Sequence, residues 1–211
     1  MDVTMIGTGK MARGISTRLL VGGHQITLVG HTAGKAESLA AELGAIGKGR
    51  IEVAHAGVLG GEVVFLAVPY AAAQSVVAKY RERLKGKVLV DITNPMNFQT
   101  LEPTSPDNIS GAEGLAKLLP DTTQVIKAFN TVFSRTLPEG QKAGQVLDVF
   151  IAGDDAEEKA KVSRLIESGG MRLIDTGPLK RARQLEASGL LHVALQSQVN
   201  GGYSTAFKLI I

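Results

Sequence analysis

Cysteine is absent from this 211-residue sequence, tryptophan is absent too, and aromatic residues make up only 4%. Without cysteine, the chain has no disulfide framework, no thiolate nucleophile and no cysteine ligands for a metal. So few aromatic residues argue against a surface on which single-stranded nucleic acid would stack. The four histidines show no metal-ligand spacing. We therefore expect neither a metal site nor a nucleic-acid partner.

Long hydrophobic runs are missing as well, and charge of either sign is not concentrated. No stretch reaches the length of a membrane-spanning helix, and the chain enters an expected strand at once without the pattern of a signal peptide. The formal net charge is +3, and basic residues run together only at Lys180 and Arg181, with Arg183 close behind. The expectation is a cytoplasmic protein that binds neither a membrane nor nucleic acid.

The abundant residue types favour one compact domain. Hydrophobic residues make up 44% of the chain, and there are 25 glycines. This composition suits an α/β protein with many tight turns, and a chain of this length can bury one substantial core. We therefore expect a single domain over residues 1–211.

The N-terminal stretch from Val3 to Ala12 carries the most informative pattern. Strand-forming residues run into Gly7, Thr8 and Gly9, and apolar residues at helical spacing follow. This is the strand, glycine turn and helix in which a G-x-G-x-x-G/A motif binds a dinucleotide. Gly7 allows the tight turn, Gly9 lets the backbone approach a pyrophosphate, and the helix dipole favours its charge. The expected cofactor-binding residues of this stretch are Gly7, Thr8, Gly9, Lys10, Met11 and Ala12.

The segment after the second expected strand indicates which dinucleotide binds. An NAD site usually carries an acidic residue there, which hydrogen-bonds the ribose and repels a 2′-phosphate. This chain has no acid before Glu37, whereas Thr32 can donate a hydrogen bond and His31 and Lys35 can supply positive charge. Thr32 also suits the N-cap of the next helix. We expect NADP(H), with its 2′-phosphate held by Gly30, His31, Thr32 and Lys35.

Strands and helices alternate along the rest of the chain. The expected strands span residues 26–29, 50–54, 62–68, 87–91, 124–129, 145–152 and 172–175. The expected helices span 35–43, a segment after Pro69, 114–119, 156–167 and most of the chain from 179 onward. Residues 96–111 are expected to be irregular, and Asp154 and Asp155 to cap a helix. This alternation predicts a Rossmann-like, doubly wound, mostly parallel sheet with a C-terminal helical segment.

The carboxyl ends of the strands are where ligands of such a sheet bind. The loops expected to line one crevice span residues 7–12, 30–35, 67–70, 93–96 and 130–131. Asn94, Lys127 and Asn130 are the candidate catalytic residues, and Lys127 or Asn130 could polarise an acceptor carbonyl. His192 is expected to pack in the core or an interface, and His55 to lie in a surface loop.

Two later motifs are more specific than the glycine turn. They are VFIAGDD at 149–155 and LIDTGPL at 173–179. With IGTG at 6–9, Gly30, and AVPY at 67–70, they resemble the NADPH-dependent oxidoreductases that reduce coenzyme F420, an 8-hydroxy-5-deazaflavin. The resemblance covers nearly the whole chain.

The resemblance implies a one-domain enzyme, usually a homodimer, in which NADP(H) and the deazaflavin meet face to face. Thr8 would join the 2′-phosphate site, and segment 179–211 would wall the second pocket. The residues near the nicotinamide half would be Ala67, Val68, Pro69 and Asn94. His31 and Lys35 stand where the family commonly carries arginines, and Asn130 stands where a relative has histidine.

Hydride transfer between two ring cofactors needs orientation rather than a nucleophile or a metal. The shortage of catalytic motifs therefore agrees with coenzyme F420 as the hydride acceptor. A reductase of the same fold that uses a flavin, a ferric ion, an imine or a small carbonyl compound is the first alternative. A non-catalytic regulator that binds NADP(H) is the second, because a fold alone does not decide function.

Overall fold

A six-stranded parallel sheet forms the centre of this computed structural model, which describes residues 1–32, 34–54, 57–97, 99–105 and 108–210. The strands run in the order β3-β2-β1-β4-β5-β8. Their bounds are β1 Asp2–Ile6, β2 Gln25–Val29, β3 Arg50–Val53, β4 Val63–Leu66, β5 Val88–Asp91 and β8 Gln124–Lys127. All five adjacent pairs are parallel, so the carboxyl ends of the strands meet at one edge. The predicted Rossmann-like fold is confirmed.

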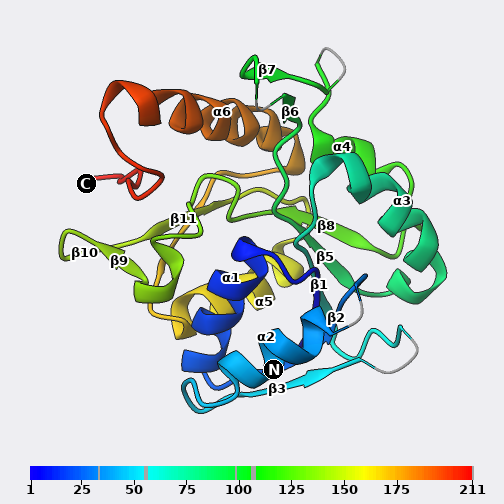
Figure 1. Cartoon of the computed structure of the whole chain (residues 1–211). Coiled ribbons are helices and arrows are strands. Elements are labelled where there is room, and N and C mark those ends of the chain that lie inside the picture. The colour runs from blue at the N-terminus through cyan, green and yellow to red at the C-terminus, as the bar shows by residue number, and fades with distance from the viewer. Residues whose placement is uncertain (33, 55–56, 98, 106–107, 211) are drawn as a thin grey trace.

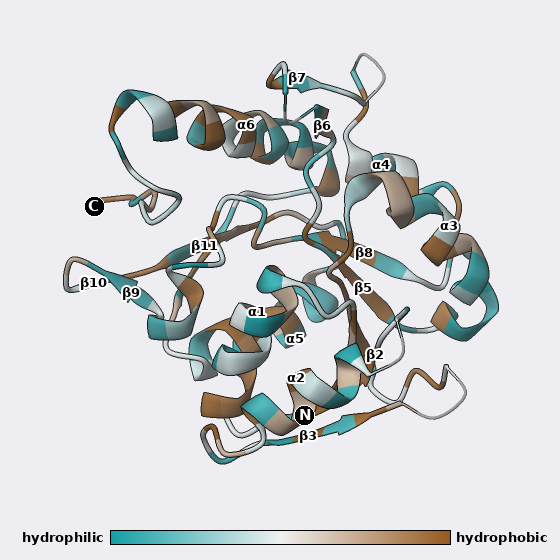
Figure 2. Ribbon diagram, viewed as in Figure 1, coloured by the Kyte–Doolittle hydropathy of each residue, from teal (hydrophilic) through white to brown (hydrophobic). Residues whose placement is uncertain are grey.

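Helices cover both faces of the sheet (Figure 1). On one face lie α1 Lys10–Val21, α2 Lys35–Leu43 and α5 Ala156–Ser168. On the other lie α3 Tyr70–Tyr80, a 3₁₀ turn at Arg81–Leu84, and α4 Gly111–Ala116. Two buried clusters, one on each face, form the core. Figure 2 shows hydrophobic strands at the centre and mixed hydropathy along the helices, as expected for a sheet buried on both faces.

A second strand pair extends this architecture beyond β8. Strands β11 Asp148–Ile151 and β12 Arg172–Asp175 are parallel to each other, and an antiparallel bridge between Lys127 and Ala152 joins them to β8. A 3₁₀ turn at Leu179–Arg181 then leads into α6 Ala182–Gln198, which lies across the carboxyl edge of the sheet (Figure 1). This helix covers the carboxyl ends of the strands, where ligands of such folds bind.

Several predicted boundaries were wrong. The expected strand 145–152 is divided into β10 Gln145–Val146, which forms a hairpin with β9 Gln141–Lys142, and β11. The expected irregular stretch 96–111 contains a hairpin of β6 Met96–Asn97 and β7 Glu102–Pro103. The helix expected at 114–119 starts at Gly111 because Ser110 and Glu113 form a capping box. The segment from 179 onward, expected to be largely helical, is helical only as far as Gln198.

The chain from 199 to 210 is therefore a tail, and a buried carboxylate holds it in place. Asp148 accepts hydrogen bonds from Arg172 (2.7 Å), from Lys208 (2.7 Å) and from the Leu209 amide (2.8 Å). Burial alone would raise the pKa of Asp148, but these hydrogen bonds outweigh it and hold the pKa at about 2. The ionised carboxylate therefore contributes stability.

We expect Asp148→Asn to destabilise the protein by about 2 kcal/mol at neutral pH, because the native pKa lies below that of an unfolded aspartate. The stabilisation is complete above the unfolded pKa and is lost as pH falls toward 2. Urea unfolding at several pH values should show the variant approaching the unmodified protein as pH decreases. An exposed-site variant, Asp121→Asn, serves as the control. A difference between Asp148→Asn and the unmodified protein that stays constant with pH would contradict this explanation.

Candidate functional site

The glycine turn between β1 and α1 has the shape that a dinucleotide requires. Gly7 has a φ of 121°, and a Cβ atom there would lie 2.1 Å from the carbonyl oxygen of Ala67, so only glycine fits. At Gly9 a Cβ would meet nothing within 4 Å, so the space above the turn is open. No side chain caps the first amides of α1, and its first turn has no acidic residue. The turn therefore fits an anionic pyrophosphate.

A hollow of about 510 Å³, here called the β2-side hollow, lies beside this turn. Its lining includes Gly30, His31 and Thr32, and a Cβ on Gly30 would lie 3.5 Å from a methyl carbon of Thr8. Lys35 begins α2 with an exposed side chain and does not line the hollow. The structure thus brings most of the predicted 2′-phosphate residues together.

The opposite wall of the β2-side hollow carries two cations that sequence reasoning missed. Lys79 and Arg83 line it from α3 and the following 3₁₀ turn, and Arg83 also donates a hydrogen bond to the Gly57 carbonyl (2.5 Å). The sequence signal that could have indicated them is the spacing of Lys79 and Arg83, four positions apart, which places both side chains on one side of a helix. One acid, Glu37, also lines the hollow, but Lys79, Arg83 and His31 outnumber it, so the hollow suits a phosphate group.

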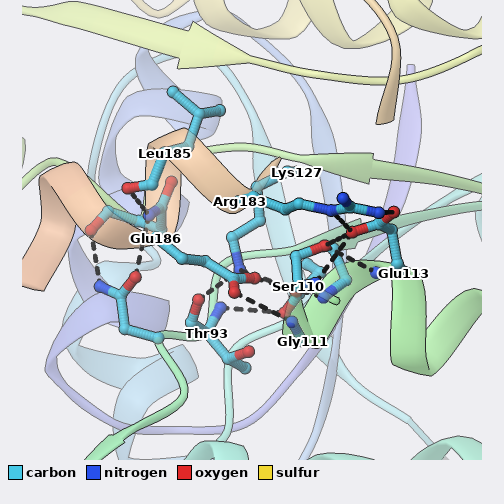
Figure 3. Close-up of polar contacts among 12 residues, drawn as sticks. Thr93, Ser110, Gly111, Glu113, Lys127, Arg183, Leu185 and Glu186 are labelled. Carbon is cyan, nitrogen blue, oxygen red and sulfur yellow. Dashed lines mark hydrogen bonds and ion pairs between the residues drawn. The ribbon is translucent and has the colours of Figure 1, made fainter. Parts of the chain in front are cut away.

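A buried ion cluster lies beneath the carboxyl edge of the sheet (Figure 3). The Lys127 ammonium is fully buried and contacts Asp91 (2.8 Å), Glu186 (2.9 Å) and the carbonyl oxygen of Thr93. Burial alone would lower the pKa of Lys127, but the two carboxylates outweigh it and raise the pKa above its ordinary value. Glu186 also accepts hydrogen bonds from the first amides of α4. All three ammonium hydrogens have acceptors, so this geometry leaves none for an acceptor carbonyl.

Asn94 and Asn130 form a reciprocal pair above this cluster. Asn94 donates to the Asn130 carbonyl (2.8 Å), and Asn130 donates to the Asn94 side-chain oxygen (2.9 Å) and to the Leu185 carbonyl (2.8 Å). A Cβ on Gly189 would lie 2.8 Å from the Asn94 oxygen, so a glycine lets α6 close on the pair. Both amide hydrogens of Asn130 are thus committed. Its side chain can still accept a hydrogen bond, but it cannot polarise a carbonyl by donation in this geometry.

Two hollows flank α6. The tail-side hollow, about 240 Å³, is lined by Thr131, Phe150, Leu185, Ser188, Phe207, Lys208 and Leu209. The hairpin-side hollow, about 440 Å³, is lined by Asn94, Pro95, Met96, Pro103, Ser105, Asn108, Ile109, Ser110, Arg183, Gln184, Glu186, Ala187 and Leu190. Adjacent residues of one helix, Ser188 and Ala187, therefore face different hollows.

His192 of α6 packs against the C-terminal tail. Its ring packs between Phe133 (centroids 4.2 Å apart) and Phe207 (4.1 Å), and its nitrogens bond the Thr131 carbonyl (3.0 Å) and the Thr205 hydroxyl (2.8 Å). Burial lowers the pKa of His192, with a smaller opposing effect from the Thr131 carbonyl. The prediction that His192 is a packed residue is confirmed.

Two predicted helix caps need correction. Gly34, with a φ of 78°, occupies the N-cap of α2 in place of Thr32, whose side chain stays exposed. Asp155 caps α5, as predicted, but Asp154 accepts a hydrogen bond from the Leu179 amide (2.8 Å) instead. The expectation for His55 lies outside the described residues. No group of three or more histidine and acidic side chains within the described ranges could hold a metal ion.

The open glycine turn, the basic hollow beside it and the roofed sheet edge define a dinucleotide-binding protein of Rossmann type. The family model described as NADP oxidoreductase coenzyme F420-dependent matches residues 2–95. The chain is 32% identical to the F420-dependent NADP reductase of Methanothermobacter marburgensis over 85% of both proteins. It therefore belongs to the coenzyme F420-dependent NADP oxidoreductase family. None of the helices in the described parts of the chain is long and apolar enough to cross a membrane.

Two further relatives differ in what they match. The chain is 33% identical to Metalloreductase STEAP3 of Rattus norvegicus over 88% of its own length, but it spans only 36% of that larger protein. A solved structure of a putative F420-dependent NADP reductase from Arthrobacter sp. FB24 matches with a TM-score of 0.81 and 26% identity. That match covers 99% of this chain and 98% of the other. The fold is therefore shared over the entire length.

Gly9→Val should fold normally but weaken NADPH binding at least about tenfold, because its side chain would project into the open space that a pyrophosphate needs. Gly7→Ala is the matched variant, and it should destabilise the fold because its Cβ would collide with Ala67. Calorimetric titration and thermal unfolding separate the two effects. Undiminished NADPH affinity in a folded Gly9→Val protein would overturn this assignment of the turn.

Proposed function

We propose that the protein transfers a hydride between NADP(H) and coenzyme F420. The observation that carries this proposal is the similarity to an F420-dependent NADP reductase over 85% of both chains, with the open glycine turn in place. Residues 1–211 would act as one NADP-binding domain whose C-terminal segment walls the acceptor pocket. The expected cofactor-binding residues are Gly7, Thr8, Gly9, Lys10, Met11, Ala12, Gly30, His31, Thr32, Lys35, Ala67, Val68, Pro69 and Asn94.

The course of the dinucleotide follows from where the hollows lie. The β2-side hollow, which includes residues of α3, suits the adenosine and its 2′-phosphate. The start of α1, which follows the glycine turn beside this hollow, suits the pyrophosphate. A dinucleotide that crosses the sheet edge between them brings its nicotinamide toward Asn94, Asn130 and the tail-side hollow. The apolar side chains of Phe150, Leu185 and Phe207 there suit a planar acceptor ring.

The chemistry demands little of the side chains. When both are bound, NADPH supplies a hydride and the deazaflavin accepts it, so the protein must hold two rings close and aligned. Lys127 and Asn130 have all their hydrogens committed within the fold, and this supports orientation rather than acid catalysis by either residue. The tail and α6 would exclude water from the ring pair.

The experiment that tests the proposal is an absorbance assay of deazaflavin reduction by NADPH, with NADH as the control donor. We expect the deazaflavin absorbance to fall when NADPH is the donor and to stay unchanged when NADH is the donor. NADPH binding without any transfer would contradict an enzymatic role with coenzyme F420 and favour the regulator.

A second acceptor class has an observation in its favour. The likeness to the metalloreductase, at 33% identity over 88% of this chain, supports a metal ion, such as a ferric ion, as the electron acceptor. The same assay run with free flavin and with a ferric chelate distinguishes the classes. Transfer to these acceptors but not to the deazaflavin would favour this second candidate.

We also propose a cytoplasmic homodimer that acts on a small molecule and not on nucleic acid. Exposed apolar side chains on α6 and the tail support a partner surface: Leu191 is 55% exposed, Val199 56% and Ile210 88%. Sedimentation equilibrium should give twice the mass of one chain.

The phosphate site makes a testable prediction about nucleotide choice. Replacing Thr32, Lys35 and Lys79 together with alanine should weaken NADPH binding at least about tenfold more than NADH binding, because a hydrogen-bond donor and two cations are lost. Lys85→Ala, an exposed lysine paired with Glu82 (2.6 Å), is the control. Equal losses for NADPH and NADH would contradict the assignment of the 2′-phosphate site.

The two hollows beside α6 give a matched pair of variants. Ser188→Trp should fill the tail-side hollow and reduce deazaflavin turnover at least about tenfold while 2′,5′-ADP, which lacks the nicotinamide half, still binds, whereas Ala187→Trp enters the hairpin-side hollow and should leave turnover intact. Steady-state kinetics of both variants test the choice. The reverse pattern would move the acceptor to the hairpin-side hollow.

A further inference from the structure

Buried side-chain oxygens without a hydrogen-bond partner gather at the carboxyl ends of two neighbouring strands. Thr93 Oγ1 follows β5, while Asn130 Oδ1 and Thr131 Oγ1 follow β8, and all three lack a partner within the described part of the chain. Native proteins rarely leave such groups unpaired, because burial removes the water that would otherwise satisfy them. Their gathering where ligands of this fold bind indicates that a ligand completes them.

The Asn130 oxygen is held in a fixed orientation. The residue is 7% exposed, and its amide nitrogen donates to Asn94 (2.9 Å) and Leu185 (2.8 Å). Asn94 binds the Asn130 carbonyl in return, and the Thr93 carbonyl beside Asn94 is held by Lys127. Because both amide hydrogens already have acceptors, the side chain can only accept a further hydrogen bond, so its ligand group must be a donor.

Thr131 supplies the complementary group. Its carbonyl bonds the ring of His192 (3.0 Å), so its backbone is anchored, and the residue is 4% exposed. It lines the tail-side hollow, yet its hydroxyl is unpartnered. A hydroxyl can donate a hydrogen bond. Adjacent residues of one loop thus present an acceptor and a donor.

We infer that Asn130 Oδ1 and the Thr131 hydroxyl recognise the primary carboxamide of the nicotinamide ring. The carboxamide NH₂ donates to Asn130, and the carboxamide oxygen accepts from Thr131. Two hydrogen bonds to one substituent fix the rotation of the ring, and therefore which face it turns toward the acceptor. This inference rests on the proposed function, because that function brings the nicotinamide to this edge.

The first test uses Thr131→Val, which keeps the shape of the side chain but removes the hydroxyl. NADP⁺ binding should weaken about tenfold, as expected for one lost hydrogen bond, while binding of 2′,5′-ADP, which lacks the nicotinamide half, should stay unchanged. Thermal stability without ligand should be equal or higher, since an unpaired buried hydroxyl is gone. Equal weakening of both ligands, or none for NADP⁺, would overturn the inference.

The second test changes the ligand. The 3-acetylpyridine analogue of NADP⁺ keeps the carbonyl oxygen but replaces NH₂ with a methyl group, so it should bind the unmodified protein about tenfold more weakly than NADP⁺. Thr131→Val should weaken the analogue by the same further factor, because the carbonyl contact is common to both ligands. An analogue that binds as well as NADP⁺ would contradict the role of Asn130.

The control is Ser16→Ala, which removes another unpartnered buried hydroxyl, in α1 on the core side. It should change none of these affinities. If Thr131→Val raises the KM for the deazaflavin while NADP⁺ binding is unchanged, the pair belongs to the acceptor and the inference fails. The affinity for NADP⁺ can be measured without any deazaflavin turnover. A failure of this inference can therefore be told apart from a failure of the proposed function.

Discussion

The buried contact between Lys127, Asp91 and Glu186 is the interaction on which the site depends. Removing one partner of such a cluster leaves an uncompensated charge in the interior, at a cost of about 3–5 kcal/mol. The cluster connects β8, the end of β5, the start of α4 and the roofing helix α6. Because Glu186 is anchored by Lys127, α6 stays across the sheet edge, and the loop after β5 stays fixed through the Thr93 carbonyl.

In this arrangement, one set of groups holds the site in place and another set is available to bind a ligand. The charged groups of Lys127, Asp91 and Glu186 are paired with one another. The side-chain oxygens of Asn130 and Thr131, in the loop that follows β8, have no hydrogen-bond partner within the described residues. The hydrogen bonds of Asn130 to Asn94 and Leu185 and the backbone contact of Thr131 with His192 hold these two residues in place. The tail adds a further wall: Asp148 holds Lys208 and Leu209, which line the hollow beside α6. Pre-organised walls of this kind suit a reaction that requires alignment.

Local patterns in the sequence predict most of the fold, because β4 is a continuous apolar run, other strands carry shorter apolar stretches, and the glycine turn between Gly7 and Ala12 follows a strand and opens a helix. Contacts between distant segments are harder to predict. Lys127 ends a strand and reads as a ligand-facing residue, yet it binds acids 36 and 59 positions away. The segment from 179 onward is expected to be largely helical, but α6 ends at Gln198, and hydrogen bonds to Asp148 and His192 hold the tail from 199 to 210 in an irregular conformation. The approach of Lys79 to the β2 loop cannot be predicted from local patterns, because the two segments are distant in the sequence and meet only in the folded sheet.

The most direct test of the account is the path of the hydride. NADPH carrying deuterium at either one of its two C4 positions would be mixed with the protein and coenzyme F420, and the reduced deazaflavin analysed by mass spectrometry. We expect full transfer of deuterium from one labelled form and none from the other, because a fixed nicotinamide presents a single face to the acceptor ring in a water-excluded site. Deuterium transferred from both forms, or lost to solvent, would contradict it.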